Sequence, residues 1–559
     1  MQLLIAACNA AGISKFVVCP GSRSAPLVIE VSGNTENETV VIADERCAGY
    51  YAMGMAQQLK QPVAVICTSG TAVLNLAPAV CEAYYQQIPL VVLSADRPSG
   101  AAERGENQAL LRQEKFLEHF TLHSLDYSTA LPMAYMQSAA KVAYQLMAEC
   151  NGIIKGPVHI NVRLDEPLYN TTTDVVNLPD FVPLKTDEVQ ITLRDLKKMQ
   201  QAFAHSQQKM LLVGMHAKDN NIQKLITTIG KRSDTVIVQD TLANLHIPEA
   251  ITQTDACLLL NDKKGKFIAP DCLISIGGTF TSKRLRQFLS KYPPRIHFDL
   301  STAIEGKTKQ WLPCMYPFTL RPSAEFVLQA LANTPVKTEL NYSQKWQIFQ
   351  TKAIQLKDSF LASAPYSDLT AISEILHHLP PKTNVQLGNS TVVRYAGFNA
   401  PNKNCTYNGN RGTSGIDGCV STAAGAAHIH KDITLCIVGD VSFLYDSNAL
   451  WNNQLSPRLR IVVINNGGGN IFRWLDGSSG VKNFEKYFET AHTHSAKHLA
   501  TMFQLPYYIC TRQSELLPTF KKFLSKQNRK ASILEIKTNN TTSAAVYKQF
   551  IAQLTSSTD

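Results

Sequence analysis

The chain has 559 residues, and its 54 Lys and Arg against 44 Asp and Glu give a formal net charge of +10. The length predicts about three or four domains and excludes a single small module. A hydrophobic share of 45% with 18% charged residues excludes a disordered chain. The positive charge is compatible with an anionic partner, and nucleic acid is the first alternative to consider.

The 13 cysteines form no disulfide framework and no zinc motif, because no two of them are separated by only two residues and several lie inside apolar runs. A reducing compartment is therefore expected. The first residues lack the basic segment that precedes the apolar core of a signal peptide. No apolar run approaches the ~18 residues of a membrane span. We expect a cytoplasmic protein without a membrane span.

In the first third of the chain, short β-branched runs alternate with alanine-rich helical patterns. Helices are expected over residues 46–59 and 72–86. The expected strands are residues 15–19, 39–43, 62–67, 89–94 and 157–162. Strands that alternate with helices predict a parallel sheet covered on both faces. The polar, proline-bearing stretch 171–192 is expected to be a linker.

A second α/β unit follows, and the final third repeats the pattern after another polar stretch at residues 334–344. The expected strands are 210–213, 235–239, 272–276 and 296–299 in the middle unit, and 385–387, 433–438, 459–464 and 532–536 in the last. The middle unit has no G-x-G-x-x-G motif, so nothing in it indicates a bound dinucleotide. We predict three α/β domains, each a largely parallel sheet flanked by helices, over residues 1–170, 190–333 and 345–559.

The first and last thirds resemble each other in the order and spacing of their turn motifs. The matched positions are Gly21 with Gly388, Arg46 with Arg411 and Gly70 with Gly439, at offsets of 367, 365 and 369 residues. Such constant offsets favour two copies of one fold on either side of a middle domain. Chance matching of common turn sequences is the alternative.

Two polar turns near the end of the chain carry the strongest chemical signal. Gly439, Asp440 and Ser442 follow one hydrophobic strand, and Asn466 with its following glycines ends another, with 25 residues between Asp440 and Asn466. The ends of neighbouring parallel strands lie side by side, where ligands bind. Carboxylate, amide and carbonyl oxygens suit Mg²⁺, and glycine turns before helices suit phosphate. The pair favours a metal–diphosphate site over two ordinary turns.

These motifs resemble those of thiamine-diphosphate-dependent enzymes of the decarboxylase and acetolactate synthase type. Val441 departs from the glycine that ends the Gly-Asp-Gly motif of that family. Further motifs resemble one branch of the family, which joins 2-oxoglutarate to isochorismate in menaquinone biosynthesis. They lie at residues 19–27, 44–46, 68–72, 95–98, 281–285, 388–390 and 410–418.

The resemblance implies thiamine diphosphate as cofactor, with Mg²⁺ or, in its place, Mn²⁺. It makes Asp440, Asn466 and the Gly468 carbonyl the metal ligands. Glu45 resembles the catalytic glutamate that hydrogen-bonds the aminopyrimidine ring and promotes the tautomer that acts as a base. An ordinary carboxylate in a first helical turn is the alternative for Glu45. The other implied cofactor contacts are Ser69, Gly70, Ile416 as the wedge that bends the cofactor, Gly439 and Ser442.

The implied substrates, 2-oxoglutarate and isochorismate, carry carboxylates that planar guanidinium groups bind in pairs of hydrogen bonds. The cations within the matched motifs are therefore expected to bind them: Arg23, Arg97, Lys283, Arg284, Arg394 and Arg411. The residues expected to orient the substrate or form the apolar wall of its pocket are Ser22, Gln108, Asn389, Ser390 and Phe472. For any one of these cations alone, a solvated surface charge is the alternative.

The resemblance further implies a homodimer or homotetramer in which the first domain of one subunit and the last domain of another share each active site. Three alternatives are weighed. An acetolactate-synthase-type enzyme would keep Glu45 without needing the arginines. A non-catalytic scaffold predicts loss of Glu45, Asp440 or Asn466, and all three are present. A nucleic-acid-binding protein would gather its basic residues in a stripe, whereas the Lys and Arg outside the motifs are dispersed.

Overall fold

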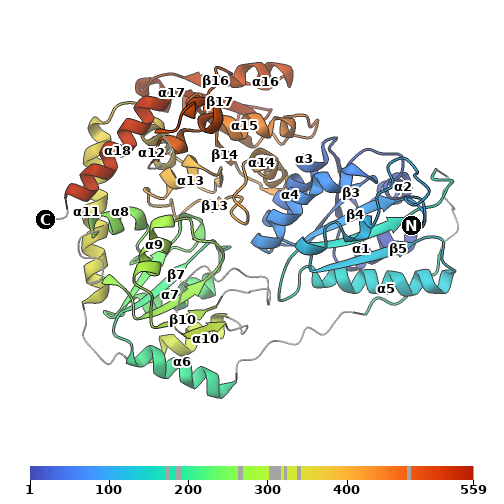
Figure 1. Cartoon of the computed structure of the whole chain (residues 1–559), viewed down its shortest axis with the longest axis horizontal. Helices are drawn as coiled ribbons and strands as arrows, with labels where there is room; N and C mark the ends of the chain where they lie inside the picture. Colours follow the sequence, from blue (N-terminus) through green and yellow to red (C-terminus); the bar gives the residue numbers. More distant parts are fainter. Residues whose placement is uncertain are drawn as a thin grey trace.

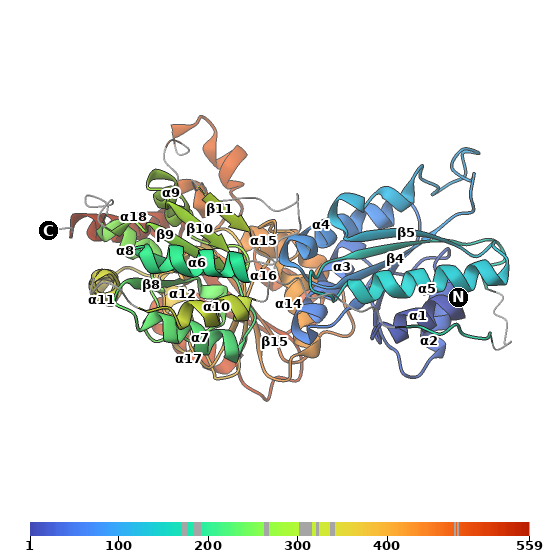
Figure 2. The same cartoon turned by 90° about the horizontal axis from the view of Figure 1, so that it is seen from below.

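The computed structural model describes residues 1–169, 176–182, 192–261, 268–300, 316–319, 324–335, 341–474, 477 and 480–557. Three sheets follow one another along this part of the chain, and every strand pairing in them is parallel. Helices flank each sheet, as the sequence predicts (Figures 1 and 2). The expected linker at 171–192 is described only at 176–182 and 192, where the chain forms neither helix nor strand.

The first sheet has the strand order β2-β1-β3-β4-β6-β5. Its strands are β1 (Lys15–Val18), β2 (Glu38–Val41), β3 (Val63–Cys67), β4 (Leu90–Asp96), β5 (His123–Ser128) and β6 (Val158–Arg163). The helices around it are α1 (Gln2–Ala10), α2 (Ala25–Gly33), α3 (Glu45–Leu59), α4 (Thr71–Gln86) and α5 (Met133–Glu149), with short turns η1 (Gln113–Lys115) and η2 (Glu118–Phe120). The central strands β3 and β4 are buried along their whole length, which explains their continuous apolar sequences.

The last sheet has the order β13-β12-β14-β15-β17-β16. Its strands are β12 (Asn384–Leu387), β13 (Thr406–Asn408), β14 (Thr434–Gly439), β15 (Leu459–Asn465), β16 (Tyr507–Cys510) and β17 (Ser532–Lys537). Numbered within each domain, the first and last sheets have the same order, 2-1-3-4-6-5. The predicted relationship between the two outer domains is therefore confirmed in their topology.

The helices of the last domain include one that reaches back to the middle domain. They are α11 (Tyr342–Ser363), α12 (Asp368–His377), α13 (Thr391–Ala396), α14 (Cys419–Ile429), α15 (Asp440–Tyr445), α16 (Ala496–Met502), α17 (Gln513–Phe523) and α18 (Asn540–Ser556), with short turns η5 (Ser447–Leu450), η6 (Asn470–Arg473) and η8 (Glu485–Glu489). Helix α11 begins inside the polar stretch 334–344 and contacts both α8 (Thr254–Leu260) of the middle domain and α18.

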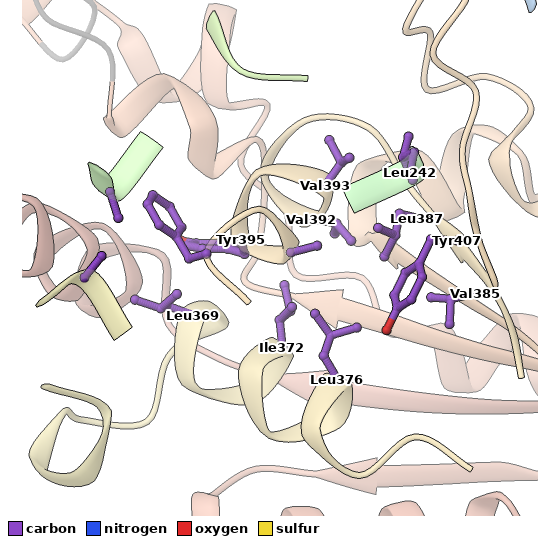
Figure 3. Packing of buried hydrophobic residues seen from close by; sticks show 14 of the residues in the cluster. Leu242, Leu369, Ile372, Leu376, Val385, Leu387, Val392, Val393, Tyr395 and Tyr407 are labelled. Atoms are coloured by element: carbon purple, nitrogen blue, oxygen red, sulfur yellow. The ribbon is translucent and has the colours of Figure 1, made fainter. Parts of the chain in front are cut away.

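The middle sheet has the order β11-β10-β9-β7-β8. Its elements are α6 (Leu193–His205), β7 (Lys209–Val213), α7 (Asn220–Gly230), β8 (Thr235–Gln239), η3 (Thr241–Ala243), α8 (Thr254–Leu260), β9 (Cys272–Ile276), α9 (Lys283–Lys291), β10 (Ile296–Asp299), β11 (Tyr316–Thr319) and α10 (Ala324–Ala332). Figure 3 shows Leu242 of this domain beside Leu387 and Val393 of the last domain, in one buried cluster. Within the described residues, no helix combines the length and apolarity needed to cross a membrane.

Helices α3 and α14 hold the first and last domains together. A Cβ atom added at Gly54 of α3 would lie 2.1 Å from the Thr422 carbonyl oxygen, and one added at Gly425 of α14 would lie 1.9 Å from the Tyr51 carbonyl oxygen. Only glycine allows the two backbones to approach so closely. The Asp44 side chain caps α3 by accepting a hydrogen bond from the Cys47 backbone. The crossing fixes the first residues of α3 relative to the last domain.

Candidate active site

The two polar turns predicted to hold a metal lie together at the carboxyl ends of the adjacent strands β14 and β15. Asp440, the first residue of α15, accepts hydrogen bonds at Oδ2 from the backbone nitrogens of Gly467 (2.8 Å) and Gly468 (3.0 Å). Its Oδ1 accepts a hydrogen bond from the Val441 backbone nitrogen at 2.8 Å. His492 Nε2 lies 3.3 Å from Asp440 Oδ2, and this carboxylate raises the pKa of the imidazole.

The side-chain amide of Asn466 leaves its oxygen available as a metal ligand. Its Nδ2 donates to Asp368 Oδ2 at 2.7 Å, while its Oδ1 is buried and has no hydrogen-bond partner among the described residues. Gly468 is buried with φ +153°, and a Cβ there would lie 2.7 Å from the Glu489 carbonyl oxygen. Among the described residues, no group of three His, Cys, Asp or Glu could hold a metal. The carboxylate, amide and carbonyl oxygens of 440, 466 and 468 fit Mg²⁺ chemically.

The loop before α14 contacts both outer domains. Ser442 Oγ donates to the Ile416 carbonyl at 2.9 Å, which links this loop to the helix that follows Gly439. On the other side, the buried Glu82 carboxylate of α4 accepts from the backbone nitrogens of Gly412 (2.6 Å) and Thr413 (2.7 Å). No sequence motif singles out Glu82, because it lies within a helix, far along the chain from the loop that it holds.

Glu45 is half-buried at the first position of α3, directly after the Asp44 cap. Burial raises the pKa of the Cys67 thiol, and the Glu45 carboxylate adds to that increase, which places Glu45 near the end of β3. The start of α3 meets the end of α15, because Arg46 Nη2 donates to the Tyr445 carbonyl at 3.1 Å. Helix α15 thus has Asp440 at its first residue and contacts the Glu45 turn at its last.

The Ser69–Gly70 turn lies at the end of β3, before α4. Ser69 is buried, and its Oγ has no partner among the described residues. Gly70 has φ +81°, and its backbone nitrogen donates to Gln113 Oε1 at 3.0 Å. Gln113 is a further residue that no sequence motif indicates. Gln108, which is exposed, lies against this turn, since a Cβ on Gly70 would be 3.4 Å from that of Gln108.

Arginines from the middle and last domains gather at one place, and we call Arg284, Arg286, Arg394 and Arg411 the arginine cluster. Burial and the nearby Arg394 lower the pKa of Arg411, and Arg286 contributes to the lowering at both Arg394 and Arg411. Burial raises the pKa of Asp255, and the nearby charges of Arg284 and Arg394 oppose this rise. The carboxylates of Asp240, Glu82 and Asp255 offset part of this positive charge, and the pKa values of Arg394 and Arg411 are nevertheless lowered, which favours an additional anionic ligand. Arg286 was not among the predicted residues.

Contacts of the last domain orient the cluster. Arg411 Nη1 donates to Asn389 Oδ1 at 2.8 Å, and Arg411 Nε is buried with no partner among the described residues. Arg394 donates to the Ser390 carbonyl. Lys283 is exposed at the start of α9, on the same helix as Arg284 and Arg286.

The predicted cations of the first domain do not belong to the arginine cluster. Arg23 is buried and pairs with Glu166 at 3.0 Å, and Arg97 Nη1 lies 3.8 Å from Glu106. The Nε atoms of both arginines are buried and have no partner among the described residues. Ser22 next to Arg23 is exposed. In the last domain, the half-buried Phe472 lies after the glycine run, with its ring 6.0 Å from that of Phe488.

Comparison with known proteins agrees with this arrangement. Residues 1–116 match the N-terminal TPP-binding domain of thiamine pyrophosphate enzymes, and residues 386–536 match their C-terminal TPP-binding domain. The crystal structure of benzoylformate decarboxylase from Polynucleobacter necessarius has the same fold, with a TM-score of 0.72 at 13% identity over 96% of this chain and 98% of that one. The fold and the two matched domains define a thiamine-diphosphate-dependent enzyme.

Curated relatives narrow the class to one family. The chain is 36% identical to the 2-succinyl-5-enolpyruvyl-6-hydroxy-3-cyclohexene-1-carboxylate synthase of Flavobacterium johnsoniae, over 99% of this chain and 98% of the relative. It is 34% identical to the synthase of Cytophaga hutchinsonii, over 96% of each, and 32% identical to that of Porphyromonas gingivalis, over 97% and 95%. The chain belongs to the 2-succinyl-5-enolpyruvyl-6-hydroxy-3-cyclohexene-1-carboxylate synthase family.

Proposed function

We propose that the enzyme converts 2-oxoglutarate and isochorismate into 2-succinyl-5-enolpyruvyl-6-hydroxy-3-cyclohexene-1-carboxylate and CO₂, in menaquinone biosynthesis. The observation that carries the proposal, within this family, is the arginine cluster, whose members Arg394 and Arg411 lie on the same domain as the Asp440–Asn466 oxygen ligands. Both substrates carry carboxylates, and guanidinium groups are suited to bind them in a partly buried site. A pocket for pyruvate alone would not need so many cations.

Bound thiamine diphosphate would supply a thiazolium ring that accepts the electrons released on decarboxylation. Asp440, Asn466 and the Gly468 carbonyl would hold Mg²⁺, or Mn²⁺ in its place, against the diphosphate. Glu45 would exchange a hydrogen-bonded proton with the aminopyrimidine ring. Ile416 would support the bent cofactor, and Ser69 Oγ, which has no partner among the described residues, would contact its ring. Gly70, Gly439 and Ser442 would make the remaining cofactor contacts that the resemblance implies.

The arginine cluster would bind the substrate carboxylates and keep them in place while the new carbon–carbon bond forms. Asn389 orients Arg411 in this site, because its Oδ1 accepts the guanidinium hydrogen bond. Arg23 and Arg97 of the first domain each carry a buried Nε without a partner among the described residues, and we propose that they complete the site around the second substrate. The rest of the substrate site is lined by Lys283, Ser22, Gln108, Ser390 and Phe472.

A substrate-requirement assay tests the proposed reaction. Purified protein is supplied with thiamine diphosphate, Mg²⁺, 2-oxoglutarate and isochorismate, and isochorismate absorbance is followed. We expect the absorbance to fall only when all four are present. Turnover of pyruvate without isochorismate at an equal rate would instead assign an acetolactate-synthase-type activity.

The role of Glu45 is tested by Glu45→Gln, which keeps the shape of the side chain and removes its acid–base chemistry. We expect a folded protein whose turnover is about 10²- to 10⁴-fold slower, the usual contribution of general acid–base catalysis. Circular dichroism checks the fold and steady-state kinetics the rate. Unchanged turnover would remove Glu45 from the mechanism.

We also propose that the enzyme is a cytoplasmic homodimer or homotetramer, with Glu45 and Asp440 of each active site on different subunits. The contact between the Glu45 turn and α15, which the structure has within one chain, would then be made between two subunits in the assembly. None of the twelve described cysteines forms a disulfide bond, which supports a reducing compartment. Co-expression of the Glu45→Gln and Asp440→Asn chains tests the sharing. Half of randomly assembled dimers are mixed, and each has one intact site, so about a quarter of wild-type activity should return. Return of no activity would place both residues of a site on one chain.

For the domain limits we propose residues 1–170, 190–333 and 345–559, with α11 as the helix through which the third domain contacts the second. The buried Trp346 in α11 and the hydrogen bond from Tyr342 Oη to the Ile268 carbonyl (2.9 Å) support this connecting role.

A further inference from the structure

A buried carboxylate holds both ends of the glycine turn between β15 and η6. Asp368 Oδ2 accepts hydrogen bonds from Asn466 Nδ2 at 2.7 Å and from Asn470 Nδ2 at 3.1 Å. Asp368 Oδ1 accepts hydrogen bonds from the hydroxyl groups of Thr538 (2.5 Å) and Ser543 (3.0 Å). Asp368 is 0% exposed, and every hydrogen bond to its carboxylate comes from a side chain.

This arrangement fixes how both amides point. The NH₂ group of each asparagine must face Asp368 Oδ2, because the opposite orientation would bring two oxygen atoms within hydrogen-bond distance. The Oδ1 atoms of Asn466 and Asn470 are therefore directed away from the carboxylate. Both are buried, and neither has a partner among the described residues. A buried amide oxygen without a partner is costly, so a ligand on that side is expected.

The same contacts set the path of the backbone. Asn466 and Asn470 flank Gly467, Gly468 and Gly469, and the Asn470 backbone nitrogen donates to the Gly468 carbonyl at 3.0 Å. Asp368 itself is anchored at the start of α12, where Ser367 and Thr370 form a reciprocal capping box. A rigid helix end thus holds the turn that offers two of the three proposed metal ligands.

We propose that Asp368 is a positioning residue for the divalent cation, and that it directs Asn466 Oδ1 and the Gly468 carbonyl toward that cation. The inference rests on the proposed function, which places the cation beside Asp440. Asp368 does not touch the cation, because both oxygens of its carboxylate are occupied by side-chain donors. Residues that orient a metal ligand in this way typically change metal affinity about 10- to 100-fold when they are replaced.

The test uses Asp368→Asn in the full-length protein. The amide has one oxygen acceptor and no charge. If its NH₂ group faces Asn466 and Asn470 it opposes their donors, and if its oxygen faces them their charge-assisted hydrogen bonds become weaker neutral ones. Apoprotein with thiamine diphosphate is titrated with Mg²⁺, and binding is read from tryptophan fluorescence, with Trp474 close to the turn. We expect the Mg²⁺ affinity to fall by about 10- to 100-fold, and excess Mg²⁺ to restore cofactor binding.

Thr538→Val is the matched control, because it removes a hydrogen bond from Asp368 Oδ1 and leaves the Oδ2 contacts in place. It should keep the Mg²⁺ affinity close to that of the wild type. In an Asn466→Ala background, Asp368→Asn should cost less Mg²⁺ affinity than it does alone, because part of its effect passes through Asn466. Should Asp368→Asn not fold, Asn470→Ala releases one end of the turn and should still weaken Mg²⁺ binding.

The outcomes separate this inference from the proposed function. If the wild-type protein gains no thiamine diphosphate affinity from Mg²⁺, the proposed function itself is wrong. If the wild type responds to Mg²⁺ and Asp368→Asn or Asn470→Ala responds equally, only the positioning role is overturned. Equal losses of Mg²⁺ affinity in Asp368→Asn and Thr538→Val would also overturn it, since they would reflect general destabilisation.

Discussion

The close crossing of α3 and α14 makes Gly425→Ala the sharpest test of how the outer domains meet. The added methyl group would lie 1.9 Å from the Tyr51 carbonyl oxygen and 2.7 Å from the carbonyl carbon. Ordinary contact requires about 3.5 Å between such atoms, so the helices must separate by roughly 1.5 Å. The opposing atom belongs to a helical backbone and cannot move alone.

The expected cost follows from this overlap. Overpacking of a core costs about 1–3 kcal/mol, and a backbone obstacle places Gly425→Ala at the upper end. The better helix propensity of alanine offsets at most about 1 kcal/mol, so a net loss of about 2 kcal/mol is predicted. Helix α14 begins shortly after Ile416, and its displacement should also weaken thiamine diphosphate binding.

Thermal melting and cofactor titration measure the two effects. The melting midpoint is compared instead of a free energy of unfolding, because a three-domain chain does not unfold in two states. Gly33→Ala in α2 is the matched control, since a Cβ there would meet no atom within 4 Å. We expect a lower midpoint and weaker cofactor binding for Gly425→Ala alone. A midpoint and affinity equal to those of the wild type would refute the close crossing.

Two further changes test buried carboxylates between the domains. Gly412 and Thr413 donate to different oxygens of Glu82, so Glu82→Gln turns an amide NH₂ toward one of these two backbone donors. Losing one hydrogen bond to the carboxylate costs about 1.5–3 kcal/mol. Because the loop after Arg411 then loses an anchor, the KM for the substrates should rise. An unchanged KM would show that Glu82 does not position Arg411. Burial raises the pKa of Asp446 from 3.8 to about 7. Between pH 3.8 and about 7 the folded protein therefore keeps a proton on Asp446 that the unfolded chain has lost. The free energy of unfolding should fall as the pH rises through this window, by about 4 kcal/mol at most. Denaturation of Asp446→Asn, which cannot titrate, should lack this slope; the same slope in both proteins would assign it to other groups.

The strands that the sequence predicts lie mostly inside the sheets, and those it misses lie at the edges. Strands such as β3, β4 and β15 are buried on both faces and therefore read as continuous apolar runs. The missed strands are β5, β11, β13 and β16, and each lies at an edge of its sheet. β5 has one buried residue, Tyr127, among exposed and partly buried ones, and β13 has only three residues. Edge strands carry little of the apolar signal on which the prediction depends.

The candidate site divides in a similar way. Asp440 and Asn466 stand in recognisable turns, and the predicted meeting of those turns follows from their place on adjacent parallel strands. Glu82 and Asp368 were missed because they act on residues 330 and 98 positions away in the chain, through contacts that only the fold creates. Arg286 was missed because it lies two residues after Arg284 on α9, a spacing that does not by itself place two side chains on one helix face.

The stoichiometry of the reaction tests the central claim most directly. With thiamine diphosphate, Mg²⁺, isochorismate and 2-oxoglutarate labelled at its first carbon, released CO₂ and consumed isochorismate are counted in the same sample. The proposed reaction predicts one labelled CO₂ for each isochorismate consumed, and neither when one substrate is withheld. Steady release of labelled CO₂ without isochorismate, or loss of isochorismate without labelled CO₂, would contradict it.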